Sequence, residues 1–201
     1  MTHSASVTEA KARVREEARR QRSDIDPATR AAASAAIARH TIDLIEKLRP
    51  ETLAAYFAVR SEVDTHAILA WADRVHLPVV LPAVEGDGNL TFRRYRPADA
   101  LAAGGFGIPT PLPDAEAVLP DVLIVPMLAF DRTGTRLGYG RGHYDRAIAH
   151  LRNHRVDPRL VGVAFAVQEV TAVPAEAHDV RMDFIVTETE TIDLRVGKAK
   201  G

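Results

Sequence analysis

The residues best suited to chemistry lie in one glycine-rich stretch, FDRTGTRLGYGRGHYDRAI, at positions 130–148. Three glycines occupy every second position in its middle: Gly138, Gly140 and Gly142. Glycine lets the backbone adopt positive φ and bring its N–H groups close to an anion. The N-terminus of the helix expected to follow adds partial positive charge, and Arg136 and Arg141 add formal charge. The stretch is therefore suited to binding phosphate.

The spacing of these glycines does not by itself identify a nucleotide site. It matches neither the P-loop nor the dinucleotide pattern GxGxxG, and a glycine-rich turn without a ligand would also explain it. Asp145, in the first turn of the expected helix, would stabilise the helix dipole but repel a phosphate. A Mg²⁺ ion between the two groups would remove this conflict. An ordinary charge at a helix N-terminus is the alternative for Asp145.

A second concentration of charge lies at residues 11–22, KARVREEARRQR, with six basic and two acidic side chains. On a helix, an arc of about 80° would hold four of the basic residues: Lys11, Arg15, Arg19 and Arg22. They could form a solvated face paired with nearby acids, or they could bind nucleotide phosphate or an RNA backbone. An RNA surface usually adds net positive charge and aromatic side chains. The helix lacks aromatics and the chain has a net charge of −1, so a small anion is favoured.

The composition limits the classes of protein to consider. The 201 residues are 46% hydrophobic and 26% charged, as in an ordinary globular chain, and we expect one domain over residues 1–201. The absence of cysteine excludes a disulfide scaffold, thiol catalysis, a zinc ribbon and an iron–sulfur site. No apolar run reaches the roughly 20 residues of a membrane span, and the N-terminus lacks the apolar segment of a signal peptide. We therefore expect a cytoplasmic protein with no membrane partner.

Helix and strand patterns alternate along the chain after two N-terminal helices. The first helix is expected to end near Arg22, and the second to span 26–48 with Asp26 as its N-cap and Pro27 in its first turn. Apolar runs predict strands at 53–59, 78–82, 90–95, 122–125, 160–165 and 184–186. Further helices are expected at 64–75, 97–103 and 142–151. This alternation indicates an α/β fold with a mostly parallel sheet covered on both faces.

Five segments, in order along the chain, resemble the 5-formyltetrahydrofolate cyclo-ligase family, also called 5,10-methenyltetrahydrofolate synthetases. They are the KxxxR of Lys11 and Arg15, SEVDT at 61–65, GIPTP at 107–111, RLGYGRGHYD at 136–145 and HDVRMDFIVTE at 178–188. The fourth segment is the most specific, and the resemblance extends from Lys11 to Asp183. It implies that the fold is a three-layer α/β/α sandwich.

The resemblance also implies roles for residues at an ATP site. Lys11 and Arg15 would bind the nucleotide phosphates, and Lys11, Arg141 and Asp145 would be the catalytic residues. The wall of the site would be formed by Arg136, Leu137, Gly138, Tyr139, Gly140, Arg141, Gly142, His143 and Tyr144. Asp145 and Asp179 match the positions that hold Mg²⁺ in the family. An ordinary turn carboxylate is the alternative for Asp179.

A folate site is implied next to the ATP site. The folate would contact Phe57, Glu62 and Phe106, and also five residues of the glycine stretch: Tyr139, Gly140, Arg141, Gly142 and His143. As alternatives, Phe57 could be a core residue and Glu62 could cap the following helix. His143 stands where relatives often have an aromatic residue, which puts a stacking role of this position in doubt.

The reaction implied by the resemblance uses ATP and Mg²⁺ to convert 5-formyltetrahydrofolate to 5,10-methenyltetrahydrofolate, with release of ADP and phosphate. The formyl oxygen is phosphorylated, and N10 then closes the ring. Phosphoryl transfer needs positioning and charge neutralisation more than a covalent protein group, which suits a chain without cysteine. We expect a monomer that binds these small molecules and no nucleic acid. The alternatives are a phosphate-transferring enzyme acting on another amide or pterin, and a non-catalytic nucleotide- or RNA-binding relative.

Overall fold

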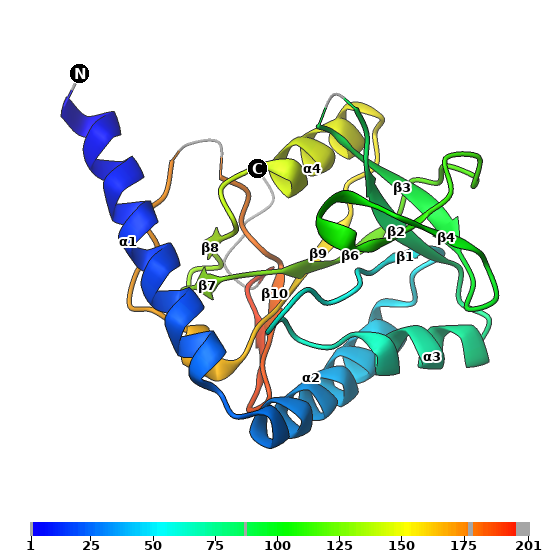
Figure 1. Ribbon diagram of the computed structural model, residues 1–201, viewed down its shortest axis with the longest axis horizontal. Coiled ribbons are helices and arrows are strands. Elements are labelled where there is room, and N and C mark those ends of the chain that lie inside the picture. The colour runs from blue at the N-terminus through cyan, green and yellow to red at the C-terminus, as the bar shows by residue number, and fades with distance from the viewer. Residues whose placement is uncertain (1, 87, 177–178, 196–201) are drawn as a thin grey trace.

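A computed structural model describes residues 2–86, 88–176 and 179–195, apart from the side chains of residues 2–6 and Phe106. Its centre is a seven-stranded sheet (Figure 1). In spatial order its strands are β11 (Thr191–Asp193), β10 (Phe184–Val186), β9 (Arg159–Val163), β6 (Val122–Pro126), β1 (Leu53–Ala54), β2 (Val79–Val84) and β3 (Leu90–Tyr95). Neighbouring strands from β10 to β2 are parallel, and the edge strands β11 and β3 are antiparallel to their neighbours. The predicted mostly parallel sheet is confirmed.

Helices cover both faces of this sheet (Figure 1). They are α2 (Pro27–Leu48), α3 (His66–Arg74) and α4 (His143–Asn153). α2 and α3 pack on one face in a core cluster that includes Ile124 of β6, whereas α4 packs on the other face with Leu123 and Val125 of the same strand. Successive residues of β6 thus point into different layers, as the pleat of a strand requires. The predicted three-layer α/β/α sandwich is confirmed.

The first helix, α1 (Thr2–Asp24), lies beside a hairpin that follows the central strand β6 (Figure 1). The hairpin consists of β7 (Ala129–Phe130) and β8 (Arg136–Leu137), which pair antiparallel. Ala18 of α1 packs against Ala129 and Leu137 in a separate apolar cluster. This cluster fixes the helix against the part of the chain that carries the glycines.

The start of α2 confirms its predicted signals. Oδ1 of Asp26 accepts hydrogen bonds at 3.0 Å from the N–H groups of Ala28 and Thr29, and Pro27 occupies the first turn. α1 extends slightly beyond the expected end, to Asp24. No helix within the described ranges is both long and apolar enough to cross a membrane.

Two local predictions are wrong. Residues 97–103 contain no helix, because β4 (Leu101–Ala103) pairs antiparallel with β5 (Pro109–Pro111) around the 3₁₀ turn η1 (Gly105–Gly107). Pairing with another segment thus outweighs the helix propensity of the alanines, which is only a weak preference. The strand expected at 53–59 ends at Ala54, after which the chain leaves the sheet. A second 3₁₀ turn, η2 (Ala166–Gln168), follows β9.

Candidate functional site

The glycine loop, defined here as residues 138–142, runs from the β7–β8 hairpin into α4. Gly140 and Gly142 have φ angles of 88° and 64°, in the left-handed region that favours glycine. Gly138 does not adopt this conformation, so the sequence argument for positive φ holds for two of the three glycines. Gly142 is the residue directly before α4, which places the backbone of the loop at the positive end of that helix.

A buried carboxylate holds the hairpin that leads into the loop. Asp131 accepts hydrogen bonds from the N–H groups of Thr133 (2.9 Å), Thr135 (3.2 Å) and Val173 (2.9 Å). Burial by itself would raise the pKa of this carboxyl, but the hydrogen bonds outweigh burial and lower the pKa below its usual value. Asp131 therefore fixes the start of β8, from which Arg136 and the glycine loop follow.

α1 directs its basic arc towards the glycine loop. Nε of Arg15 donates a 3.0 Å hydrogen bond to the carbonyl of Gly138, and a Cβ on Gly140 would lie 3.2 Å from Cζ of Arg15. The guanidinium of Arg19 lies 5.7 Å from the centroid of the Tyr139 ring. The arc predicted from helical spacing therefore faces the loop at Arg15, which is half-buried, whereas Arg19 is exposed, so the solvated-face alternative still describes Arg19.

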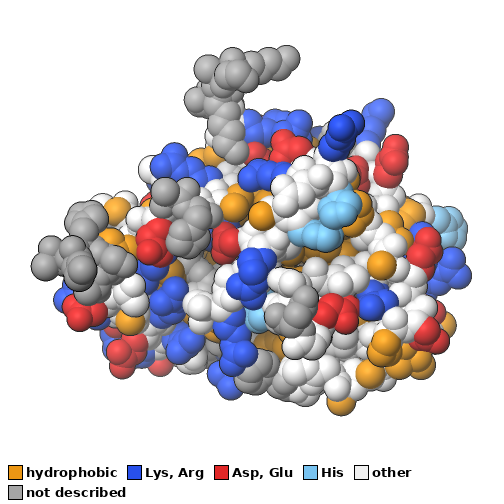
Figure 2. All heavy atoms as spheres, turned by 90° about the horizontal axis from the view of Figure 1, so that it is seen from above, with side chains coloured by type: hydrophobic (Ala, Val, Ile, Leu, Met, Phe, Trp, Pro, Cys, Tyr) orange, Lys and Arg blue, Asp and Glu red, His pale blue; other side chains and the backbone are white. Residues whose placement is uncertain are grey.

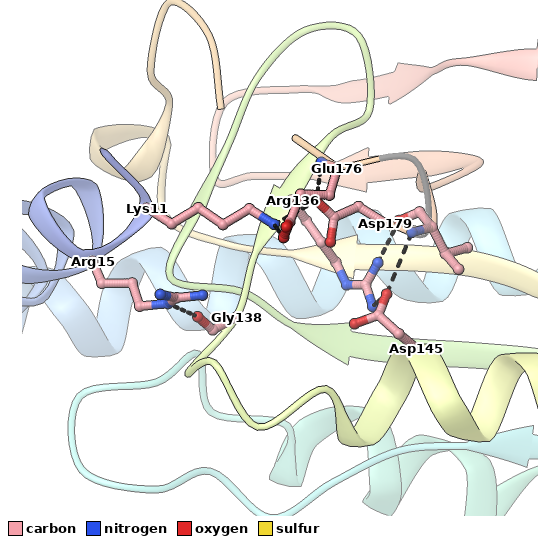
Figure 3. Close-up of polar contacts among 8 residues, drawn as sticks. Lys11, Arg15, Arg136, Gly138, Asp145, Glu176 and Asp179 are labelled. Carbon is pink, nitrogen blue, oxygen red and sulfur yellow. Dashed lines mark hydrogen bonds and ion pairs between the residues drawn. The ribbon is translucent and has the colours of Figure 1, made fainter. Parts of the chain in front are cut away.

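Lys11, one turn earlier on α1, is buried between two carboxylates. Its Nζ lies 2.7 Å from Oε2 of Glu176 and 2.7 Å from Oδ2 of Asp179 (Figure 3). Burial by itself would lower the pKa of the ammonium group, but the hydrogen bonds and charges of the two carboxylates outweigh burial and raise the pKa. Oδ2 of Asp179 also accepts a 2.7 Å hydrogen bond from the N–H of Glu176, so these two acidic residues contact each other as well as Lys11.

A second ion pair lies next to the first (Figure 3). Nη2 of Arg136 donates to Oδ1 of Asp145 at 2.8 Å, and the N–H of Val180 donates to the same oxygen at 3.3 Å. Nη1 of Arg136 donates to the carbonyl of Val180. Because Val180 directly follows Asp179, one short segment joins the two ion pairs. A shared metal site of Asp145 and Asp179 stays a prediction.

The donor set around Asp145 and Asp179 fits a Mg²⁺ ion only in combination with a phosphate. Within the described ranges, no cluster of three or more His, Cys, Asp or Glu side chains could hold a metal by itself. Magnesium usually takes one or two carboxylates and completes its shell with water and substrate phosphate oxygens. Asp145 is paired with Arg136, and Asp179 is paired with Lys11. A metal ion would therefore bind where each carboxylate already has a positively charged partner.

Glu62 and Tyr139 form the neighbouring part of the site. Tyr139 Oη donates to Oε1 of Glu62 at 2.5 Å, and the N–H of Val59 donates to Oε2 at 2.9 Å. Burial, followed by the charge and hydrogen bond of Glu62, raises the pKa of Tyr139 to about 12. Glu62 therefore closes its own turn and contacts the loop, and the alternative that it caps α3 is wrong.

Two aromatic residues, Phe57 and Phe106, were expected near a folate. The Phe57 ring lies 5.5 Å from the Tyr95 ring, edge to face, and 5.7 Å from that of His66, and it packs partly against the core. Phe57 is therefore partly a core residue, and part of its ring is still exposed. The side chain of Phe106 lies outside the described part of the chain.

The other residues predicted to line the ATP site mainly contact the protein's own core and backbone. Leu137 is buried beside α1, and Tyr144 packs against the α4 core, where burial and then the charge of Glu62 raise the pKa of its phenol. Nδ1 of His143 lies 2.8 Å from the carbonyl of Gly88, in the turn between β2 and β3. Arg141 lies in the glycine loop with an exposed side chain, and its carbonyl accepts a hydrogen bond from Nη1 of Arg146.

Comparison with known proteins decides the family. A model of the 5-formyltetrahydrofolate cyclo-ligase family matches residues 7–188. The chain belongs to this family. A 5-formyltetrahydrofolate cyclo-ligase of Haemophilus influenzae is 33% identical over 181 residues, covering 86% of this chain and 95% of that protein. One from Escherichia coli K12 is 36% identical over 147 residues, covering 69% of this chain and 79% of that protein.

A solved structure supports the same assignment. The NMR structure of 5,10-methenyltetrahydrofolate synthetase from Aquifex aeolicus superposes with a TM-score of 0.81 at 31% sequence identity. The alignment covers 95% of this chain and 96% of that one. The family resemblance seen in the sequence motifs is therefore confirmed, and with it the prediction that the chain is an enzyme of the cyclo-ligase family.

Sequence reasoning missed the contacts of three residues in this candidate site: Glu176, Arg22 and Ser61. Glu176 binds Lys11 across 165 positions of sequence, and nothing in the local pattern distinguished it from a surface acid. Arg22 and Ser61 lie beside Tyr139 and Glu62, with Nε of Arg22 donating to Oγ of Ser61 at 3.1 Å. For Arg22 a signal existed, because it belongs to the basic arc of α1.

Proposed function

We propose that this cyclo-ligase uses ATP and Mg²⁺ to convert 5-formyltetrahydrofolate to 5,10-methenyltetrahydrofolate, releasing ADP and phosphate. The main support is the position of α1, which places Arg15 against the glycine loop that leads into α4 and places Lys11 against Asp179, next to the Arg136–Asp145 ion pair. The membership of the family and the small-molecule substrates in its name agree with this proposal. We divide the site into a phosphate half (Lys11, Arg15, Asp145, Asp179 and the glycine loop apart from Tyr139) and a folate half (Phe57, Glu62, Phe106 and Tyr139).

In the phosphate half, the residues of this chain position and neutralise the triphosphate. Lys11 and Arg15 bind phosphate oxygens from α1, the loop amides bind them from the other side, and Arg141 reaches the transferred group. Asp145 and Asp179 would hold Mg²⁺, which supplies charge neutralisation of the phosphates. Arg136 keeps Asp145 in place, since its own guanidinium is fixed by the carbonyl of Val180.

Binding of the nucleotide involves an exchange of partners. In the structure, Lys11 is paired with Glu176 and Asp179. The triphosphate then takes the place of these carboxylates at Nζ. The buried ammonium group of Lys11 then has a negatively charged partner both before and after the nucleotide binds. A buried cation without such a partner would be costly.

In the folate half, Glu62 is suited to accept hydrogen bonds from the N–H groups of the pterin. A carboxylate can accept about four hydrogen bonds, and two are already made by Val59 and Tyr139. Phe57 offers a partly exposed aromatic face beside the rings of His66 and Tyr95, and Phe106 and the loop residues up to His143 would complete the expected contacts.

The reaction then needs no covalent intermediate on the protein. The formyl oxygen attacks the γ-phosphorus and ADP leaves; N10 next attacks the activated formyl carbon, the carbon–oxygen bond to phosphate breaks, and N10 loses its proton to solvent. The residues of the two halves hold the formyl oxygen in line with the γ-phosphate and neutralise the charge that develops.

A nucleic-acid function has less support from the structure. Lys11 and Arg22 are buried, and Arg15 contacts the loop, so most of the basic arc is turned inwards. On the face drawn in Figure 2, the described basic side chains are interspersed with acidic ones, unlike the continuous basic surface of an RNA-binding protein. The absence of nucleic-acid binding, the monomeric state and the cytoplasmic location stay predictions.

The proposed function is tested by mixing the purified protein with 5-formyltetrahydrofolate, ATP and Mg²⁺ and following the near-ultraviolet absorbance of the methenyl product. We expect absorbance to grow only when all three are present, and to stop when a chelator is added. A folded protein that binds ATP but forms no product would contradict the proposed substrate. Product formation without ATP or in the presence of chelator would contradict the proposed mechanism.

A further inference from the structure

Arg22, in the last turn of α1, is a buried cation that the phosphate half does not use. It is 3% exposed. Its Nη2 donates a 2.8 Å hydrogen bond to Oη of Tyr139, and its Nε donates a 3.1 Å hydrogen bond to Oγ of Ser61. The guanidinium also lies 5.7 Å from the centroid of the Tyr139 ring. One side chain thus joins α1, the glycine loop and the segment that carries Glu62.

The contacts of Arg22 determine how the Tyr139 hydroxyl is oriented. A hydroxyl has one hydrogen to donate and two lone pairs to accept. Because Arg22 can only donate, the Tyr139 hydroxyl accepts from it and directs its own hydrogen to Glu62, at 2.5 Å. The chain of donors therefore runs in one direction, from Arg22 through Tyr139 to the Glu62 carboxylate. Charge-assisted hydrogen bonds of this kind are stronger than those between neutral groups.

The contact with Ser61 fixes the other side of Glu62. Arg60 has a φ of 57°, a left-handed conformation that costs energy for a residue other than glycine, so this turn needs external support. Glu62 supports it locally by accepting the N–H of Val59, and Arg22 supports it from α1 through Ser61. Arg22 thus supports the position of the Glu62 carboxylate from two directions, through Tyr139 and through Ser61.

We propose that Arg22 is a positioning residue of the folate half, which sets the orientation of Glu62 and Tyr139 for the substrate. This inference rests on the proposed function, since it assumes that Glu62 and Tyr139 contact the folate. It assigns Arg22 no role towards phosphate, because its donors are directed to Ser61 and Tyr139. Loss of Arg22 therefore weakens binding of the folate selectively.

The test compares Arg22→Gln with Arg13→Gln, a matched control that removes the same charge from an exposed position of the same helix. For Arg22→Gln we expect the KM for 5-formyltetrahydrofolate to rise about tenfold or more, the effect of losing hydrogen bonds to a charged group. The KM for ATP should change less than about twofold in either variant. Equal changes in both KM values, or the same folate KM in both variants, would overturn the proposal.

A double-mutant cycle with Tyr139→Phe tests whether Arg22 acts through the tyrosine. In the Tyr139→Phe background, Arg22→Gln should raise the folate KM by less than about threefold, because the route through Tyr139 is already broken and only the contact with Ser61 is left to lose. Fully additive effects would overturn the proposal. Should Arg22→Gln fail to fold, Arg22→Lys retains the charge but cannot reach both partners, and it must then show the same selective rise. An inactive wild-type protein would instead refute the proposed function, on which this inference depends.

Discussion

The two halves of the site differ in what holds their charged groups. In the phosphate half, Lys11 and Arg136 are paired with the carboxylates of Glu176, Asp179 and Asp145, whose side chains are 35%, 18% and 29% exposed. In the folate half, Glu62 is buried and is held by a tyrosine hydroxyl and a backbone amide. On the proposed function, a charged ligand would replace the first set of partners, whereas the second set would stay in place when a ligand binds.

The difference follows from the charge that each half must accept. In the proposed function, a triphosphate with its metal would bring several charges, which residues of both signs would neutralise by exchanging partners during binding. A neutral pterin ring brings only hydrogen-bond donors and acceptors, which are bound best by groups already fixed in position. Substitutions in the phosphate half should therefore affect turnover most, and those in the folate half should affect KM.

Lys11→Ala should give the largest effect, a fall in kcat/KM of about 10³-fold, because an electrostatic contact to the transferred phosphate is lost. The midpoint of thermal unfolding should fall by only about 2–4 °C, since Glu176 and Asp179 can become more solvated. Steady-state kinetics and a thermal melt measure both. Arg13→Ala is the control, and a large loss of stability with unchanged kcat would show that Lys11 is only structural.

Asp145→Asn should lower kcat/KM by about 10²-fold, in line with the loss of a charged group at the reacting phosphates. If Asp145 holds Mg²⁺, the variant should need a higher magnesium concentration for half-maximal activity. The exposed Asp157, paired with Arg152, provides the control substitution Asp157→Asn. An unchanged magnesium requirement would mean that Asp145 serves only to orient Arg136, and the phosphate half would lose its proposed metal ligand.

Much of the phosphate half was predictable, because its signals are local in sequence. The alternating glycines, the strand before them and the helix after them indicate a phosphate loop, and the spacing of Lys11 and Arg15 places both on one face of α1. The sheet was predictable for the same reason, from short apolar runs between helices. The helix expected at 97–103 was wrong because the pairing of β4 with β5 depends on residues further along the chain.

The arrangement of the folate half was not predictable, because its partners are distant in sequence. Arg22, Glu62 and Tyr139 come from three separate segments, and their alignment depends on how α1 docks against the β7–β8 hairpin. A single sequence shows that Arg22 is basic but does not show that it is buried. The same limit applies to Glu176, which meets Lys11 only in the folded chain.

Glu62→Gln should have a smaller effect than the phosphate substitutions and a different kind of effect. We expect the KM for 5-formyltetrahydrofolate to rise about tenfold, because a charge-assisted acceptor becomes a neutral amide. The KM for ATP should stay within about twofold. The exposed Glu46 on α2 gives the control Glu46→Gln. A large fall in kcat with unchanged KM values would contradict the assignment of Glu62 to a folate half that binds substrate without taking part in phosphoryl transfer.

Asp131→Asn should lower the free energy of unfolding and leave the KM values for both substrates unchanged. At pH 7 the free energy of unfolding should fall by about 1–3 kcal/mol, because the amide group of asparagine would face N–H donors that now bind a carboxylate. Folding lowers the pKa of Asp131, so this stabilisation is present above the usual aspartate pKa of about 3.9 and is lost as the pH falls through the lower pKa of the folded state. Denaturant unfolding at pH 7 and at pH values below 3.9 should therefore show the gap between wild type and variant closing in acid. Neither KM should move, since Asp131 supports the hairpin from which both halves follow; a selective change in one KM would show that the hairpin serves one half more than the other.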